Sequence, residues 1–284
     1  MTAAATSVAD KRQAFHRLHE SGCFVIPNPW DVGSARMLQS MGFPALATTS
    51  SGLAWSLGRP DNGISLDMAL EHLAEIVDAT DVPVNADFED GFAPAPDAVA
   101  ENVRAAVATG VAGLSVEDST GDEADPLYAV DHAVERIRAA RRAIDATGGD
   151  TLLVARAEGL LWGRPSLDEI VVRLTSYADA GADCLYAPGL RNPDDIARVV
   201  EAVAPKPLNV LMAWPDGITV DDLAALGVRR ISVGGALARA AWGGFLDAAR
   251  LLAEEGRFDG FGRGAKGVDL DTFFTEDRGS ARPS

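Results

Sequence analysis

Three short stretches of the chain, TGVAGLSV (109–116), AGADCLYA (180–187) and LGVRRISV (226–233), repeat one pattern. Each contains a glycine suited to ending a helix, at Gly110, Gly181 and Gly227, followed by a mostly apolar run of strand character. A further glycine, Gly42, precedes another such run. Repetition of this helix-to-strand turn predicts a chain in which helices and parallel strands alternate.

Outward from these turns, we predict eight strands, at residues 23–27, 45–50, 83–89, 113–118, 151–158, 184–188, 207–212 and 230–234. Amphipathic segments lie between most of them, at 65–79, 97–109, 128–147, 166–180, 193–203 and 219–226. Helix-capping side chains at Ser65, Ser166 and Thr219 support three of these segments. Eight such units with apolar strands predict an α/β fold, a closed (β/α)₈ or TIM barrel. A doubly wound open sheet is the rival, but no G-x-G-x-x-G motif follows the first strand.

We assign residues 1–258 to the barrel, including a long apolar helix at 236–254 that forms a C-terminal extension. Residues 259–284 form a polar, Gly-rich tail with too few apolar residues to pack alone. We expect this tail either to be disordered or to dock on a neighbouring subunit.

The formal net charge is −17, from 25 Lys and Arg against 42 Asp and Glu, which argues against a nucleic-acid partner. The one arginine-rich stretch, residues 136–142, has helical spacing and is interpreted as a solvated helix face. The two cysteines, Cys23 and Cys184, are expected to be buried free thiols of a reducing compartment. With no signal peptide at residues 1–10 and no long apolar stretch, the chain is predicted to be cytoplasmic and not membrane-bound.

Polar residues gather at the predicted carboxyl ends of the strands, where barrel enzymes place their active sites. Asp87 and Glu89 are two residues apart on one strand and therefore point the same way, while Glu117 ends the next strand. Three buried carboxylates repel one another unless a cation lies among them. Oxygen ligands favour Mg²⁺, with Mn²⁺ as an alternative, over Zn²⁺. The acids could instead pair with arginine or lysine, or cap helices.

The four histidines, His16, His19, His72 and His132, all fall in predicted helices, away from the strand ends. We interpret them as solvated helix residues, which argues against a Ser-His-Asp triad or a zinc-bound water. Gly234 and Gly235 after the last strand could bind a phosphate or form a plain tight turn.

At these residues the sequence resembles the isocitrate lyase/phosphoenolpyruvate mutase superfamily, from about residue 24 to 258. The motifs that carry the resemblance are NPWDVGSA (28–35), TTSSGLAWSLGRPDNG (48–63), NADFEDGF (85–92), VED (116–118), ARAEG (155–159), LNVL (208–211) and RISVG (230–234). Their order along eight strand-helix units is more specific than any single motif.

The resemblance implies roles for individual residues. Asp87 together with Asp61, Glu89 and Glu117 would surround Mg²⁺, with Asp61 and Glu117 also counted as catalytic. Arg156 would face the enolate and the substrate carboxylate. The remaining substrate-binding residues would be Trp30, Asp31, Ser50, Ser51, Gly52 and Asn209. The resemblance also implies a homotetramer in which C-terminal helices are exchanged between neighbouring subunits.

Two departures from the family pattern narrow the activity. Residues 117–131 read EDSTGDEADPLYAVD, without the Cys-containing loop of the isocitrate lyases, and Pro188-Gly189 replaces a glutamate of those lyases. The same loop lacks the asparagine of the phosphonomutases, and its acidic residues would repel a phosphonate. Glu89 and Glu158 stand where the family has aspartate, which retains the charge.

The sequence therefore predicts a Mg²⁺-dependent carbon–carbon lyase. It would cleave or decarboxylate a bond next to the carbonyl of a small 2-oxo or 2-hydroxy di- or tricarboxylate, through an enolpyruvate-type intermediate, and an oxaloacetate-like substrate is favoured. P–C bond chemistry on phosphonopyruvate or phosphoenolpyruvate is one alternative. A protein that binds 2-oxo acids with little turnover is another.

Overall fold

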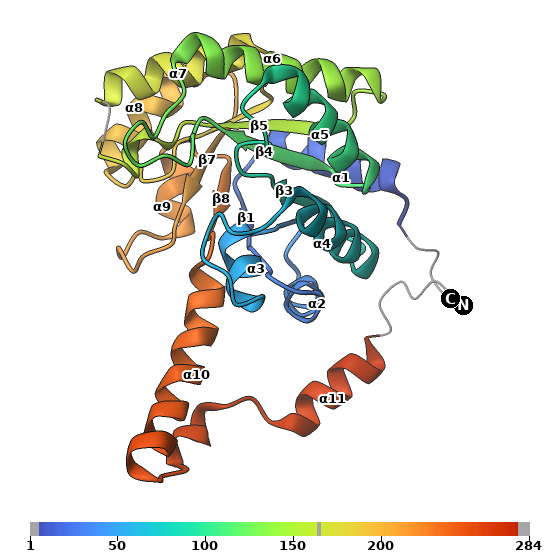
Figure 1. Cartoon of the computed structure of the whole chain (residues 1–284), viewed down its shortest axis with the longest axis vertical. Helices are drawn as coiled ribbons and strands as arrows, with labels where there is room; N and C mark the ends of the chain where they lie inside the picture. Colours follow the sequence, from blue (N-terminus) through green and yellow to red (C-terminus); the bar gives the residue numbers. More distant parts are fainter. Residues whose placement is uncertain (1–5, 164–165, 278–284) are drawn as a thin grey trace.

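The computed structural model, which describes residues 6–163 and 166–277, confirms the (β/α)₈ barrel. Its strands are β1 Phe24–Ile26, β2 Leu46–Ala47, β3 Val84–Asp87, β4 Gly113–Glu117, β5 Leu152–Arg156, β6 Cys184–Tyr186, β7 Leu208–Leu211 and β8 Arg230–Ser232. All pairs are parallel, in the order β1-β8-β7-β6-β5-β4-β3-β2 (Figure 1). The backbone N–H of Ala47 donates to the carbonyl of Pro27 (3.1 Å), which brings the two ends of the sheet together.

Helices cover the outside of the barrel. They are α1 Val8–Glu20, α2 Val32–Ser40, α3 Ser50–Ser56, α4 Leu66–Ala79, α5 Pro96–Ala108, α6 Val130–Ala146, α7 Leu167–Asp179, α8 Pro193–Val203, α9 Val220–Ala225, α10 Ala236–Glu255 and α11 Gly267–Glu276, with short 3₁₀ helices η1 Glu158–Leu160 and η2 Asp259–Arg263. The three predicted caps are confirmed, because the side chains of Ser65, Ser166 and Thr219 each accept a hydrogen bond from a backbone N–H in the first turn of their helix.

The end of the barrel at which the strands begin is closed by α1. Phe15 of this helix is fully buried and packs with Phe24, Ala112 and Leu152, which lie at or just before strand starts. A Cβ at Gly113 would lie only 2.6 Å from the Phe15 ring, so the glycine is needed for this close approach. The barrel interior is therefore plugged at this end.

Three polar side chains interpreted as solvated are in fact buried or nearly so. His72 on α4 is 7% exposed, and Nε2 of His19 on α1 is buried without a hydrogen-bond partner. Arg136 is 1% exposed, and its guanidinium donates to the carbonyls of Glu117 (3.0 Å) and Ala93 (3.0 Å). The interpretation was wrong for these residues because helical spacing does not reveal which polar side chains face the strands.

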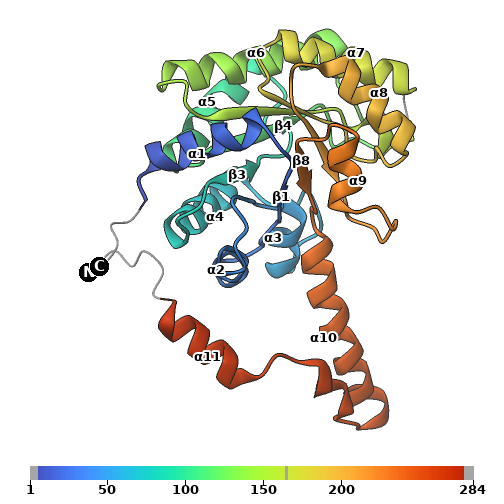
Figure 2. The same cartoon turned by 180° about the vertical axis from the view of Figure 1, so that it is seen from behind.

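The last helices leave the barrel. In both views α10 extends away from β8, and the chain then turns back through η2 and α11 (Figures 1 and 2). Arg36 of α2 pairs with Asp277 (2.8 Å), and its guanidinium lies over the Phe274 ring at 5.5 Å. Residues 259–277, assigned to the tail, thus contain η2, which packs on α10, and α11, which contacts α2. Residues 278–284 lie outside the described residues. No helix of the described chain is both long and apolar enough to cross a membrane.

We predict that His19 makes the fold sensitive to acid. Burial, followed by the positive charge of Arg230, lowers the pKa of His19 to about 3, whereas an unfolded histidine titrates near 6.5. The unfolded state therefore binds the proton more tightly, so stability is complete above pH 6.5 and falls toward pH 3. His19→Leu should reduce the loss of unfolding free energy between pH 7 and 4.5 by on the order of 2 kcal/mol. Urea unfolding at several pH values measures this.

The matched control is Leu18→Ala, in the same apolar cluster. It should lower stability at every pH and keep the wild-type slope. A His19→Leu protein with the wild-type pH slope would contradict the prediction.

Candidate active site

A cavity of about 160 Å³ opens at the carboxyl ends of the strands, as predicted. Near its rim lie Thr48, Ser50, Ser51, Asp61, Asp87 and Arg156. Asn85, Ser115 and Arg230 lie deeper, each at an inward position two residues or more before its strand ends. The polar strand ends thus converge on one hollow.

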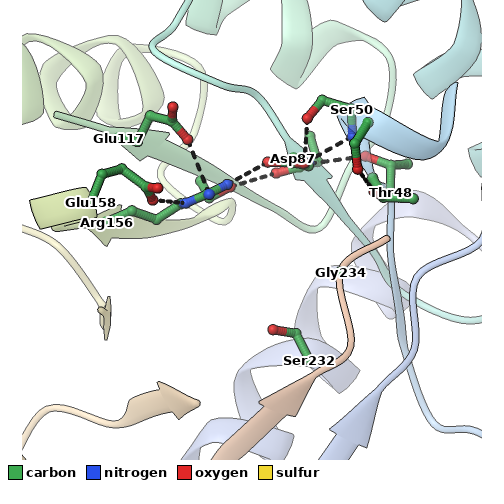
Figure 3. A network of polar contacts seen from close by, with 12 residues as sticks. Thr48, Ser50, Asp87, Glu117, Arg156, Glu158, Ser232 and Gly234 are labelled. Carbon is green, nitrogen blue, oxygen red and sulfur yellow. Dashed lines mark hydrogen bonds and ion pairs between the residues drawn. The ribbon is translucent and has the colours of Figure 1, made fainter. Parts of the chain in front are cut away.

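Arg156, the last residue of β5, joins three carboxylates (Figure 3). Its Nη1 contacts Asp87 Oδ1 at 2.6 Å, its Nη2 contacts Glu117 Oε2 at 3.1 Å and its Nε contacts Glu158 Oε1 at 2.8 Å. The guanidinium also lies over the Tyr186 ring, 5.1 Å from its centre. Burial opposes the charge of Arg156, but its acidic neighbours outweigh burial and raise its pKa well above the usual range. Arg156 therefore remains a cation.

Asp87 connects this cation to the start of α3. Its second oxygen accepts hydrogen bonds from both the backbone N–H and the hydroxyl of Ser50, each at 2.9 Å. The Asp87 N–H in turn donates to Thr48 Oγ1 (2.9 Å). The ends of β2, β3 and β5 are thereby fixed relative to one another at the rim (Figure 3).

Asp118 is a buried carboxylate outside the cavity lining that holds Glu158 in position. It accepts hydrogen bonds from Glu158 N (2.8 Å), Arg173 Nη1 (3.0 Å) and the Tyr177 hydroxyl (2.6 Å). Asp118 is 2% exposed, so its charge depends on these donors. The network holds Glu158 where it reaches Arg156.

The acids at the rim outnumber the cation beside them. Burial raises the pKa of Glu117 well above its usual range despite the opposing charge of Arg156. Burial, then the charges of Asp87 and Asp61, raises the pKa of Glu89 to about 8. Desolvation at the cavity mouth and the charge of Asp87 likewise raise the pKa of Asp61. Arg156 alone therefore does not keep all of these acids ionised at neutral pH.

The donor chemistry suits a hard divalent cation. One buried oxygen of Glu89 has no hydrogen-bond partner, and Asp87 and Asp61 lie close enough to raise its pKa. Carboxylate oxygens are the ligands that Mg²⁺ prefers. The acids do not, however, meet at one point: Arg156 lies between Asp87 and Glu117, and no group of three or more His, Cys, Asp or Glu in residues 6–163 and 166–277 could hold a metal. The assignment of Asp87, Glu89 and Glu117 as metal ligands stays a prediction.

The structure divides the predicted site residues into two groups. Those that line the cavity are Ser50, Ser51, Asp61, Asp87 and Arg156. Those that lie outside its lining are Trp30, Asp31, Gly52, Glu89, Glu117 and Asn209. Trp30 instead lines a hollow against α10, and Asp31 caps α2 by accepting from Ser34 N (2.6 Å).

Several cavity residues were not singled out from the sequence, among them Tyr186, Arg230 and Asn28. Tyr186 and Arg230 occupy inward positions of β6 and β8, which alternation along a strand could have indicated. Asn28 Oδ1 accepts from the N–H groups of Val233 (2.9 Å) and Gly234 (2.8 Å). That amide N–H of Gly234 is thus already used within a tight turn, where Gly234 has φ 51°.

Known proteins match the whole barrel. The family model described as phosphoenolpyruvate phosphomutase matches residues 15–253. An oxaloacetate decarboxylase of Pseudomonas entomophila (strain L48) is 32% identical over 251 residues, 85% of this chain and 84% of that protein. A solved structure from Burkholderia cenocepacia J2315, described as a candidate lyase/mutase, is 49% identical with a TM-score of 0.91, covering 94% of this chain and 97% of the other. A solved phosphonopyruvate hydrolase in complex with oxalate and Mg²⁺ is 25% identical with a TM-score of 0.83, covering 94% and 96%.

We predict that Asp118→Asn destabilises the barrel. The substitution keeps the shape of the side chain but removes the buried carboxylate that pairs with Arg173, which keeps only Glu169, and an amide nitrogen cannot accept from the former donors. Breaking such a buried pair costs about 3–5 kcal/mol. Urea unfolding measures the loss. Asp168→Asn is the control, because Asp168 pairs with Arg198 on the surface, where such pairs contribute at most about 1 kcal/mol. Equal effects of the two substitutions would contradict the role given to Asp118.

Proposed function

Because the chain belongs to the phosphoenolpyruvate phosphomutase family, we propose that it is a Mg²⁺-dependent lyase acting beside the carbonyl of a small 2-oxo dicarboxylate. The oxaloacetate decarboxylase relative cleaves a carbon–carbon bond, which supports this reaction type and an oxaloacetate-like substrate. The observation that carries the proposal is the joint position of Arg156, Asp87 and Ser50 at the rim of one small cavity.

The reaction places specific demands on these residues. When the bond between C3 and its carboxylate breaks, CO₂ leaves and the electron pair spreads from C3 onto the 2-oxygen as an enolate. Arg156 offers a permanent positive charge for that oxygen, and such preorganised donors are each worth about 3–4 kcal/mol. Ser51 lines the same cavity and its hydroxyl can donate to the 2-oxygen, whereas the Ser50 hydroxyl donates to Asp87. C3 then takes its proton from water, which completes the conversion to the 2-oxo monocarboxylate.

Asp87, Glu89 and Glu117, with Asp61 beside them, are the residues that would hold Mg²⁺. Burial and mutual repulsion raise the pKa values of Asp61, Glu89 and Glu117 despite Arg156, and a divalent cation would favour their charged forms. When bound, Mg²⁺ would supply further positive charge for the developing enolate. The phosphonopyruvate hydrolase complex with oxalate and Mg²⁺ supports a metal in this fold. Neutralising the acids would also release Arg156 for contact with the substrate.

The loop after β4 favours carbon–carbon over P–C chemistry. It is pinned by a bridge between Ser119 and Leu127 and carries Asp122, Glu123 and Asp125 with no basic residue. A phosphonate, with more negative charge than a carboxylate, would be repelled there. Phosphorus NMR of phosphonopyruvate mixed with the protein separates the two activities.

Replacing Arg156 with methionine should lower kcat/KM for oxaloacetate roughly 100- to 1,000-fold, because the enolate loses its fixed cation. Pyruvate formation in the presence of Mg²⁺ measures this, and a parallel assay with EDTA should show the same loss in the wild type. Arg191→Met is the control, since Arg191 pairs with Asp216 at the surface.

Near-wild-type activity of the folded Arg156→Met protein would refute this site. Wild-type protein that binds 2-oxo acids tightly but turns over none of them would indicate a binding protein instead of a lyase.

The exposed face of α10 supports the homotetramer. Trp242 and Phe245 are 39% and 59% exposed, and beside them lies an apolar hollow of about 270 Å³ formed with Trp30. Large exposed apolar groups that cluster in this way mark protein interfaces. A second copy of the chain that exchanged its C-terminal helices with the first would cover Trp242, Phe245 and the hollow beside them.

The double variant Trp242→Glu, Phe245→Glu should lower the molar mass from that of four chains, because buried carboxylates would oppose docking. Multi-angle light scattering after size exclusion gives the mass. Asp247→Asn, exposed on the opposite side of α10, should leave it unchanged. A tetramer that survives the double substitution would place the interface elsewhere.

A further inference from the structure

Arg230 on β8 brings a second positive charge into the cavity, at its floor. The residue is 2% exposed, lines the cavity and lies between it and Phe15 of the α1 plug, whose ring centre is 5.9 Å away. Its Nε donates to Asn209 Oδ1 (3.0 Å) and its Nη1 donates to Asn85 Oδ1 (3.2 Å). Both partners are neutral amides, so they orient the guanidinium without balancing its charge.

No anion of the described chain balances that charge. Among residues 6–163 and 166–277, Arg230 forms no ion pair with an acid. Cys184 and Tyr186 are the neighbours that could ionise, but burial raises their pKa values to about 11 and about 12. Both are therefore neutral at pH 7. Burial lowers the pKa of Arg230, yet a guanidinium remains protonated at neutral pH.

The two arginines of the cavity differ in this respect. Arg156 at the rim is paired with three carboxylates, whereas Arg230 at the floor has only amides and an aromatic ring. A cation–π contact contributes about 0.5–2 kcal/mol, well below the cost of several kcal/mol for burying a charge. An anion bound from the cavity would remove this imbalance.

We propose that Arg230, oriented by Asn85 and Asn209, binds one carboxylate of a small dicarboxylate at the floor of the cavity. The inference rests on the proposed function, and it adds that the carboxylate retained by the reaction points inward. The reacting carbonyl then lies near Arg156, and the carboxylate that leaves as CO₂ lies toward the rim. The cavity of about 160 Å³ limits the ligand to a few carbon atoms.

The decisive variant is Asn209→Asp, which puts a carboxylate where Asn209 Oδ1 now accepts from Arg230 Nε (3.0 Å). The Ser232 hydroxyl, which now accepts from Asn209 Nδ2, can turn to donate to the new oxygen. The internal ion pair should raise the midpoint of thermal unfolding. It should also weaken binding of malonate, a dicarboxylate that the proposed reaction does not consume, by roughly 10- to 100-fold. Calorimetric titration measures the affinity.

Arg230→Met should also lose malonate binding, but Asn209→Asp decides the question if that variant does not fold. Asn192→Asp is the matched control, because Asn192 caps α8, is exposed, does not line the cavity and gains the same charge. It should bind malonate like the wild type. Wild-type affinity in Asn209→Asp, or no malonate binding by the wild type, would overturn the inference.

The two proposals can fail separately. If Asn209→Asp loses malonate binding while the wild type turns over no 2-oxo acid, the anion site stands and the lyase function fails. If the wild type is an active lyase and Asn209→Asp binds malonate undiminished, the function stands and the role of Arg230 falls.

Discussion

The guanidinium of Arg156 is the contact on which the rim of the barrel depends. Carboxylates from β3, from β4 and from the turn after β5 all lie within 3.1 Å of its nitrogens. Without it, Asp87, Glu117 and Glu158 would face one another in a largely desolvated space and would have to take up protons. Because Asp87 also holds the start of α3, this one cation fixes parts of four successive strand-helix units. The shape of the cavity follows from that arrangement.

Most of the fold could be predicted because its signals are local. Apolar runs, four of which follow helix-ending glycines, located all eight strands, although the predicted ranges were too long where polar residues follow the strand. Residues 151–158, for example, contain the strand Leu152–Arg156 and then turn into η1. The burial of Arg136, His19 and His72 could not be predicted, because it depends on which carbonyls and rings come together only in the folded barrel.

Part of the candidate site could also be predicted from the sequence. Strand ends and alternation indicated Asp87, the family resemblance indicated Arg156 and the serines after β2, and all of them line one cavity in the structure. The prediction that Asp87, Glu89 and Glu117 converge did not foresee the arginine between them. The alternative left open, pairing with arginine, is what the structure shows for Asp87 and Glu117. Spacing along one strand cannot reveal how a long side chain from another strand passes between acids. Arg230 was missed because it entered only as the first letter of RISVG (230–234), and nothing in that motif assigns its side chain a partner.

The acidic loop between β4 and α6 affects how a substrate reaches the cavity. It lies at the same rim as the opening, with Asp122, Glu123 and Asp125 exposed, on a chain of net charge −17. The acidic surface therefore repels a doubly negative molecule as it approaches. Arg156 and Arg230 attract the molecule only once it is close to the cavity. Dissolved salt shortens the reach of the repulsion to about 8 Å at physiological ionic strength. Capture of a dianion should consequently become faster as salt is added, the reverse of an enzyme whose surface attracts its substrate.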